Sequence, residues 1–363
     1  MQILDRHIAR EAGLTWLAVT AVLLLVTLGL ALGDTLADVA AGRVPGPLLF
    51  TQISLKTLEV TTILVPLSFF LGVMLAFGRM HRDSEMSVMR SCGYGIARSF
   101  LPLLYWIIPI GAALLAISLV LSPWAARTSK TLIAAAMADL SVAGLQPGRF
   151  QEIAASNSVV YIERLDPDGN FHNAFIHLTH GGRKDVVTAR TGFQYQDEDG
   201  SRYLALVDGF RTEGTPGSGD YRRMRFARND VRLPDTETTG PVLKFNALPI
   251  AEILSGDSPQ HTAEWHWRLA PPLALLVLTL VAVPLSKSSP RRGYYGNLVL
   301  GITLYVVYAN LLSIGRAWIE DGRIPEWIGL WWVHLLGVGL ALWLLRGSRG
   351  KRRSRRSASA APA

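Results

Sequence analysis

The residues best suited to chemistry lie in one polar segment, 79–98, which reads RMHRDSEMSVMRSCGYGIAR between two long apolar runs. Asp83 or Ser84 is a suitable N-cap for a short helix, because their side-chain oxygens accept the free backbone N–H groups of a first turn. Glu85 then lies in that first turn, where a carboxylate is favoured by the helix dipole. Gly93 is a stop signal. The segment therefore predicts a short helix near 80–95 with an acidic start.

Methionines and arginines on this expected helix indicate a contact surface rather than a catalytic site. Met86 and Met89 stand three residues apart on one face, and Arg82 and Arg90 flank the helix. Methionine adapts to irregular surfaces, so such a face suits docking on a partner protein. A short amphipathic helix that lies on the lipid surface is the alternative. Glu85 disfavours this alternative, because it would face an anionic membrane leaflet.

Patterns for other chemistry are missing from the sequence. It contains no Gly-x4-Gly-Lys-Ser/Thr phosphate loop and no Gly-x-Ser-x-Gly nucleophile motif. His172, His177 and His180 lie on mixed strand faces without Cys, Asp or Glu at ligand spacing, and His261 and His266 do not form a His-Glu-x-x-His pattern. We therefore expect no metal, no cofactor and no enzyme activity in this chain. Any energy for its work is expected to come from a partner.

Six apolar runs determine how this segment is positioned. A membrane-spanning helix needs about 20 mostly apolar residues. The chain is 50% hydrophobic over 363 residues and has a mean hydropathy of +0.27. The runs that qualify are 14–32, 60–77, 100–126, 269–286, 293–315 and 327–345. The first is too long for a signal-peptide core and no cleavage site follows it, so we expect it to be retained. The fold class predicted is a six-span helical membrane protein with a large inserted domain.

Basic residues collect in alternate loops, which predicts the orientation of the spans. The basic residues on one side are Arg6, Arg10, Arg79, Arg82, Arg90, Arg98, Lys287, Arg291, Arg292, Arg346, Arg349, Lys351, Arg352, Arg353, Arg355 and Arg356. We therefore expect both termini in the cytoplasm and the large polar block outside it. Much of the net charge of +8 is this topology signal, so we expect no nucleic-acid partner. The end of the chain, 347–363, reads as a disordered basic tail.

The polar block has the pattern of an antiparallel β-domain. Short alternating runs at 158–164, 171–179, 186–195, 203–212 and 221–230 are separated by Gly-containing turns such as Asp168-Gly169. A sandwich or jellyroll-like domain is the natural expectation. The predicted organisation is spans one to three in 1–126, the β-domain in 127–264, spans four to six in 265–346 and the tail in 347–363. The block contains no cysteine, and Cys92 lies on the expected cytoplasmic side.

Four motifs in order resemble a known family. They are LAFGRMHRDSEMSVMRSCG at 75–93, GRFQE at 148–152, EWHWR at 264–268 and VPLSKSSPRRG at 283–293. Together they resemble the lipopolysaccharide export permeases LptF and LptG over nearly the whole chain. The second and fourth motifs favour the F subunit. The resemblance implies an ABC transporter permease without its own ATPase motif, in the bacterial inner membrane, with its jellyroll in the periplasm.

The resemblance also implies how the polar segment works. In the family this loop holds a coupling helix that docks in a groove of an ATPase subunit, and the conserved acid aligns with Glu85. Glu85 is expected to pair with a basic residue of that ATPase. Met86, Met89 and Arg90 are expected to fill the groove, with Arg82 beside them. ATP and Mg²⁺ would be bound by the partner.

The expected assembly is larger than this chain. It comprises a second, LptG-like permease, two LptB-like ATPase subunits, a single-span LptC-like jellyroll protein and a periplasmic bridge protein. Lipopolysaccharide would enter through lateral gates at spans one and five and pass to the bridge, whose jellyrolls join edge to edge.

Candidate substrate contacts lie near the expected outer ends of the spans. Some relatives carry basic residues at the end of span one, where this chain has Asp34 and Asp38. Other basic side chains are therefore the candidates for lipid A phosphates, although each would also suit ordinary contact with lipid headgroups. The candidate substrate contacts are Arg316 at the end of span five, Lys56, Arg43 and the cavity-lining Leu28.

Two other functions share some of these features. A mechanotransmitting ABC subunit also has a coupling helix and an external domain, but usually four spans. A membrane-anchored periplasmic scaffold module would need no coupling helix. Co-purification of an ATPase would exclude the scaffold module.

Overall fold

The structure is a computed structural model, and it describes residues 3–41, 43–143, 147–153, 158–166, 169–180, 183–197, 202–214, 220–232, 244–287 and 295–358. The chain divides into two compact units. The helical unit comprises Met1–Leu36, Phe50–Ser129 and Leu243–Ala363, and the β unit comprises Ala37–Leu49 and Lys130–Val242.

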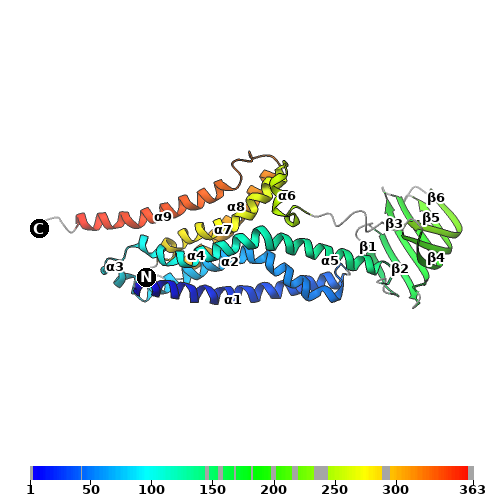
Figure 1. The fold of residues 1–363 in the computed structure, drawn as a ribbon, viewed down its shortest axis with the longest axis horizontal. Helices are drawn as coiled ribbons and strands as arrows, with labels where there is room; N and C mark the ends of the chain where they lie inside the picture. The colour runs from blue at the N-terminus through cyan, green and yellow to red at the C-terminus, as the bar shows by residue number, and fades with distance from the viewer. Residues whose placement is uncertain are drawn as a thin grey trace. The chain divides into compact units, whose positions relative to one another are not determined.

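Each of the six predicted apolar runs lies mainly on helices in the described part of the chain (Figure 1). The long helices are α1 (Ile3–Ala40), α2 (Leu49–Arg82), α4 (Phe100–Ala116), α5 (Ser122–Ala143), α7 (Pro259–Leu285), α8 (Tyr295–Glu320) and α9 (Trp331–Ala358). A π-helical turn, Ile117–Leu121, joins α4 to α5, so that these two form the third predicted span. Five helical stretches in the described chain are long and apolar enough to cross a bilayer, and the apolar part of α9, Trp331–Arg346, is shorter.

Helix α9 differs from the sequence prediction at both ends. Residues 326–330 form turns, so the helix begins at Trp331, four residues later than the predicted run. It continues to Ala358, through most of the segment predicted to be disordered. Arginine, lysine and alanine are strong helix formers, which accounts for the extension. Residues 359–363 lie outside the described part of the chain.

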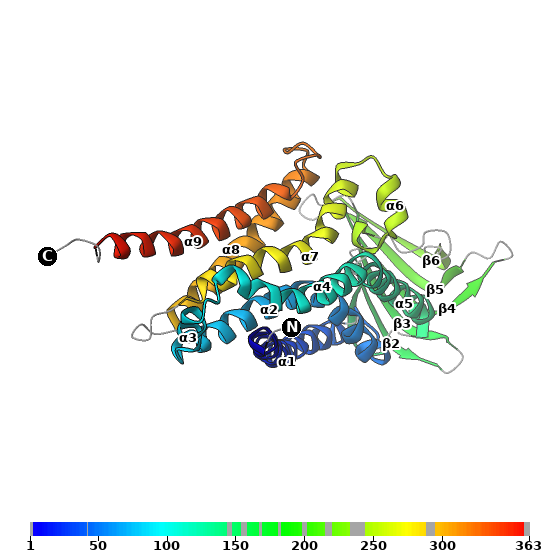
Figure 2. The same ribbon diagram turned by 60° about the vertical axis from the view of Figure 1, so that its left-hand side comes forward.

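Two short helices and three 3-10 turns are the other helical elements of the described residues. The helices are α3 (Glu85–Ser91) and α6 (Ile250–Ser255), and the turns are Gly46–Leu48, Ile96–Ser99 and Phe245–Ala247. Figure 2 shows α3 at the end of the helices where α2 and α4 meet.

The helical unit has one apolar core, and α1 joins it through a close helix contact. Phe69, Phe70 and Phe77 of α2 are fully buried. At Gly72 a side chain would meet the backbone of Trp16, because an added Cβ would lie 2.6 Å from the Trp16 Cα. Small residues allow helices in membranes to approach closely. The glycine therefore fixes where the first half of α1 packs against α2.

The described strands of the β unit form a six-stranded antiparallel sheet. Its strands are β1 (Phe150–Ile153), β2 (Ser158–Leu165), β3 (Phe171–His180), β4 (Arg183–Gln196), β5 (Arg202–Gly214) and β6 (Tyr221–Arg232). Their order in the sheet is β1-β2-β3-β4-β5-β6, the sequential order of a meander. The expected antiparallel β-domain inserted between helices is thus confirmed. A small core on one face includes Ile162, Phe171, Val187 and Leu206.

Candidate functional site

The candidate site is built on two tight turns that interrupt the path from α2 to α4. Helix α2 ends at Arg82, and the backbone of Ser84 has φ = 63°, which separates it from α3, where the helix begins again at Glu85. Gly93 has φ = 83°, a conformation that suits glycine, and ends α3. The predicted helix is confirmed, at Glu85–Ser91. The predicted side-chain cap is wrong, because Ser84 occupies the N-cap position in a left-handed conformation without a side-chain hydrogen bond to the helix.

Glu85 is paired within the chain. Its Oε2 atom lies 3.0 Å from Nε2 of His7, in the first turns of α1. The two side chains remain 35% and 41% exposed, respectively. The carboxylate is therefore oriented by α1 and still reachable from outside the chain.

The two methionines of α3 are buried in this chain. Met86 and Met89 are 2% and 6% exposed and belong to the chain's own core, together with Met80. They share one face, as their spacing predicted, and that face is turned toward the core, which also contains residues of α1 and α2. Burial of the two methionine side chains stabilises the folded chain by roughly 1.5–3 kcal/mol for each. Their burial holds α3 to the core, and their predicted contact with an ATPase groove stays a prediction.

The outward face of α3 carries different residues. Val88 is 63% exposed at its centre, between the exposed Ser87 and Ser91. Arg82 is exposed and pairs with Asp83 at 3.3 Å, and a side-chain N–H of Arg90 lies 3.4 Å from Nε2 of His81. Sequence reasoning did not single out Val88, although its position between the two methionines placed it on the opposite face.

The first turns of α1 make further polar contacts to the same segment (Figure 1, beside α3). The Tyr94 hydroxyl donates to Oδ1 of Asp5 at 2.9 Å, and the Nε atom of Arg98 lies 3.9 Å from the same oxygen. Burial raises the pKa of Tyr94, and the hydrogen bond to Asp5 adds to this, so the phenol remains a donor at physiological pH. Glu11 forms an ion pair with Arg79.

The candidate Arg316 is held in an ion-pair network. Its Nη2 atom donates to Oε2 of Glu264 at 3.0 Å and its Nε atom to Oε1 of Glu320 at 2.8 Å. Its guanidinium also lies 5.0 Å from the ring centroid of Trp267. A phosphate that bound Arg316 would therefore compete with Glu320, the more exposed of the two carboxylates.

Glu264 also forms an ion pair with a buried arginine, which the sequence indicated only as part of the EWHWR motif. Arg268, four residues later on α7, donates from Nε to Oε1 of Glu264 at 2.9 Å. Its Nη2 atom donates to the carbonyl oxygens of Phe245 at 3.2 Å and Leu248 at 2.8 Å. The Glu-x-x-x-Arg spacing at the start of an apolar run was the available signal, because charges there must be paired.

The other candidate substrate residues belong to elements other than α3. Arg43 pairs with Asp38 at 3.1 Å in the β unit. Lys56 is half-buried on α2, and Leu28 is half-buried on α1. Their predicted contact with substrate stays a prediction.

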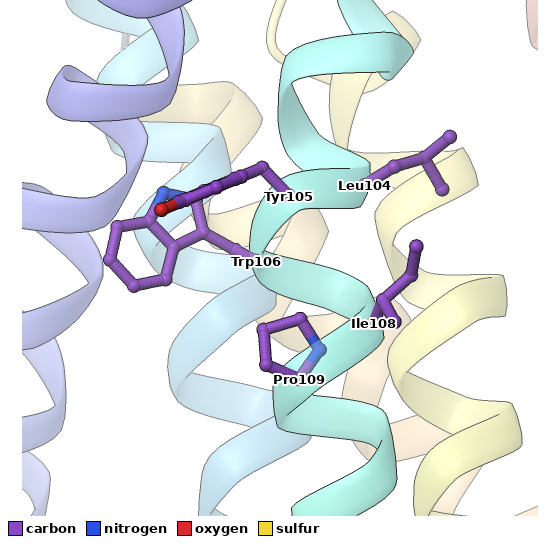
Figure 3. A pocket seen from close by; sticks show the side chains of 5 residues that line it. All are labelled: Leu104, Tyr105, Trp106, Ile108 and Pro109. Carbon is purple, nitrogen blue, oxygen red and sulfur yellow. The ribbon is translucent and has the colours of Figure 1, made fainter.

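Two apolar hollows occur on the surface of the described helices. The first, of about 490 Å³, is lined by α4 residues (Figure 3), and the second, of about 560 Å³, by α9 residues. Figure 3 shows Trp106 pointing from α4 toward α1, and Leu104 and Ile108 pointing to the other side. Neither hollow contains a predicted site residue. The described residues include no group of three or more His, Cys, Asp or Glu placed to hold a metal ion. His172 instead pairs with Asp166 at 2.7 Å.

Comparison with known families identifies the chain. Residues 6–347 match the family described as "Lipopolysaccharide export system permease LptF/LptG". The chain belongs to the LptF/LptG family. It is thus a multi-pass membrane subunit of a lipopolysaccharide export system and not itself an ATPase.

Individual relatives of this LptF/LptG chain are similar along nearly their whole length. Proteins described as "Lipopolysaccharide export system permease protein LptF" from Escherichia coli K12, Escherichia coli O157:H7 and Shigella flexneri are each 27% identical over 345 residues. The alignment covers 94% of this chain and 93% of each relative. The resemblance to the F subunit inferred from the motifs is confirmed.

Proposed function

We propose that this chain is the permease subunit that couples ATP hydrolysis by a partner to extraction of lipopolysaccharide from the inner membrane and delivery to a periplasmic bridge. The observation that carries the proposal is α3, a short helix between two spans with an outward face and a half-exposed carboxylate. A permease without its own nucleotide site needs such a projecting element to receive motion. Family membership supports the substrate class.

The assembly proposed for this chain has two homologous permeases above two ATPase subunits, which bind the ATP and Mg²⁺. A single-span jellyroll protein and a periplasmic bridge protein complete it. Both termini lie in the cytoplasm and the β unit lies in the periplasm. The arginines of the α2–α4 loop support this orientation, because basic residues are retained on the cytoplasmic side.

In the proposed docking, Glu85 pairs with a basic residue of the ATPase and Val88 enters its groove. Arg82 and Arg90 contact the rim. Met86 and Met89 hold α3 to the permease, so that the docked helix moves together with α2 and α4. Movement of these spans changes the volume of a cavity between the two permeases and drives the glycolipid upward.

The substitution Glu85→Ala tests the docking. A carboxylate that pairs with a cation at an interface typically contributes 2 kcal/mol or more when partly desolvated, so we expect about 30-fold weaker ATPase binding or greater. The ATPase is co-purified with the permease pair in detergent, and lipopolysaccharide release is measured in proteoliposomes. The matched control is Asp321→Ala, which removes an exposed acid from the α8–α9 turn. Full binding and release by Glu85→Ala would exclude the proposed role.

Contact with substrate is proposed for Leu28, Lys56, Arg43 and Arg316. Leu28 offers the cleaner test, because Arg316 supports an ion-pair network. A photocrosslinking residue at Leu28 should give an ATP-dependent adduct with lipopolysaccharide, detected by immunoblotting in cells. The same residue at Leu342, an exposed position on α9, is the control. An intact complex with equal adducts at both positions would contradict a substrate path along α1.

A further inference from the structure

The first turns of α1 grip the segment that carries α3 at three polar positions. Asp5 accepts a hydrogen bond from Tyr94, His7 pairs with Glu85, and Glu11 pairs with an arginine at the end of α2. We call these contacts the polar clamp, defined by Asp5, His7 and Glu11 of α1 with Tyr94, Arg98, Glu85 and Arg79.

Between these polar contacts, α1 also packs through apolar side chains. Ile8 and Ala12 are completely buried and belong to the same core as Met86 and Met89. Positions 5, 8 and 12 share one helical face. The polar clamp therefore lies beside buried apolar residues of the same helix and is not a set of isolated surface ion pairs.

Helix α4 also contacts the first turns of α1. The indole N–H of Trp106 donates to the carbonyl oxygen of Ala9 at 2.8 Å. The ring lies so close to Gly13 that an added Cβ would be 2.6 Å from it. Figure 3 shows this ring reaching from α4 toward α1. The start of α1 is thus held by α2, α3 and α4 together.

Trp16 and Thr20 still donate hydrogen bonds to Ser68 of α2, at 3.2 and 2.9 Å, but the middle of α1 beyond them has little packing within the described chain. Its most apolar 18-residue window contains no buried residue. Val22, Leu25 and Leu30 are 62%, 73% and 66% exposed. A rigid helix that is held over its first turns and is unpacked along its middle moves with the elements that hold those turns.

We propose that α3 drives α1 directly through the polar clamp, so that docking of the ATPase swings α1 in the membrane. This inference rests in part on the proposed function, which supplies the ATPase as the source of motion. Asp5, His7 and Glu11 are positioning residues, since they touch neither nucleotide nor substrate. Each of these pairs has a partner that is more than 40% exposed, and ion pairs open to solvent contribute little to folding free energy, so their loss should change the transmitted motion more than the stability.

The test measures the movement of α1 in the complete complex of both permeases and the ATPase in nanodiscs. Spin labels are placed at Val22 on α1 and at Leu276 on α7, which is 43% exposed, in a Cys92→Ser background. Electron–electron double resonance gives the distance between the labels with and without ATP and vanadate. The unmodified clamp should show a nucleotide-dependent shift of this distance.

Paired variants distinguish transmission from a general loss of structure. Glu11→Arg should abolish the shift and lower the lipopolysaccharide released per ATP by about tenfold, and adding Arg79→Glu should restore both, as coupled ion pairs do. His7→Leu should reduce the shift, whereas His7→Gln, which keeps an N–H donor toward Glu85, should retain it. Asp321→Arg, which disrupts the exposed pair with Arg323, is the matched control.

The outcomes separate the two proposals. A nucleotide-dependent shift of the distance that disappears in Glu11→Arg and returns in the double variant supports the clamp. If the same complex releases no lipopolysaccharide, that result counts against the proposed function and not against the clamp. No shift with the unmodified clamp, or a shift that survives in Glu11→Arg and His7→Leu, would overturn the clamp.

Discussion

At the residue scale, Glu264 shows how a membrane protein keeps charges buried. Its side chain is 3% exposed and that of Arg268 is 2% exposed. One carboxylate oxygen accepts from Arg268 and the other from Arg316, so a single acid serves two arginines. Buried charges are stable only when paired and hydrogen-bonded. Removal of Glu264 should therefore be costly, because it leaves two cations without their shared partner.

Substitution of Glu264 by leucine should lower the stability of the helical unit. We expect a loss of about 3–5 kcal/mol, the usual cost of breaking a buried ion pair on one side. Thermal unfolding of the purified chain in detergent measures this loss. The control is Glu320→Leu, which removes the 38% exposed partner of Arg316 and should cost about 1 kcal/mol or less. Equal losses of stability in the two variants would contradict the explanation that the larger cost comes from burial of the Glu264 ion pairs.

At the element scale, the sequence predicts what depends on local patterns. The five alternating runs correspond to β2–β6 within a few residues, because period-two alternation and glycine turns act locally. Strand β1 was missed as a strand, since Phe150–Ile153 has only four residues and too short an alternation to recognise. The order of the strands in the sheet depends on pairing between runs, which no single run contains.

Helix α3 marks the limit of this kind of prediction for the site. Its position and its methionine face follow from residue spacing, and both are present. Which neighbour covers that face does not follow, because Met86 and Met89 pack against elements distant in sequence. The pair between Glu85 and His7 joins residues 78 positions apart. Long-range contacts of this kind decide whether a side chain is an anchor or a docking surface.

At the scale of the whole molecule, the distribution of arginines predicts one orientation. The segment that joins α2 to α4 carries Arg79, Arg82, Arg90 and Arg98, whereas the turn between α8 and α9 mixes acids with Arg323. The sole cysteine of the chain, Cys92, is exposed in the first of these loops. It is therefore a natural reporter of the side on which α3 lies.

Cysteine labelling should confirm this orientation. In intact spheroplasts a membrane-impermeant maleimide should leave Cys92 unlabelled, because arginine-rich loops remain in the cytoplasm, and lysis should expose it. In a Cys92→Ser background, cysteine at Arg223 on the exposed side of β6 should react before lysis. The permease pair is examined with and without the ATPase, because a docked ATPase covers the end of α3. Labelling of Cys92 in intact spheroplasts would contradict the orientation. Labelling after lysis that the ATPase blocks would place that subunit on the face of α3 that carries Val88.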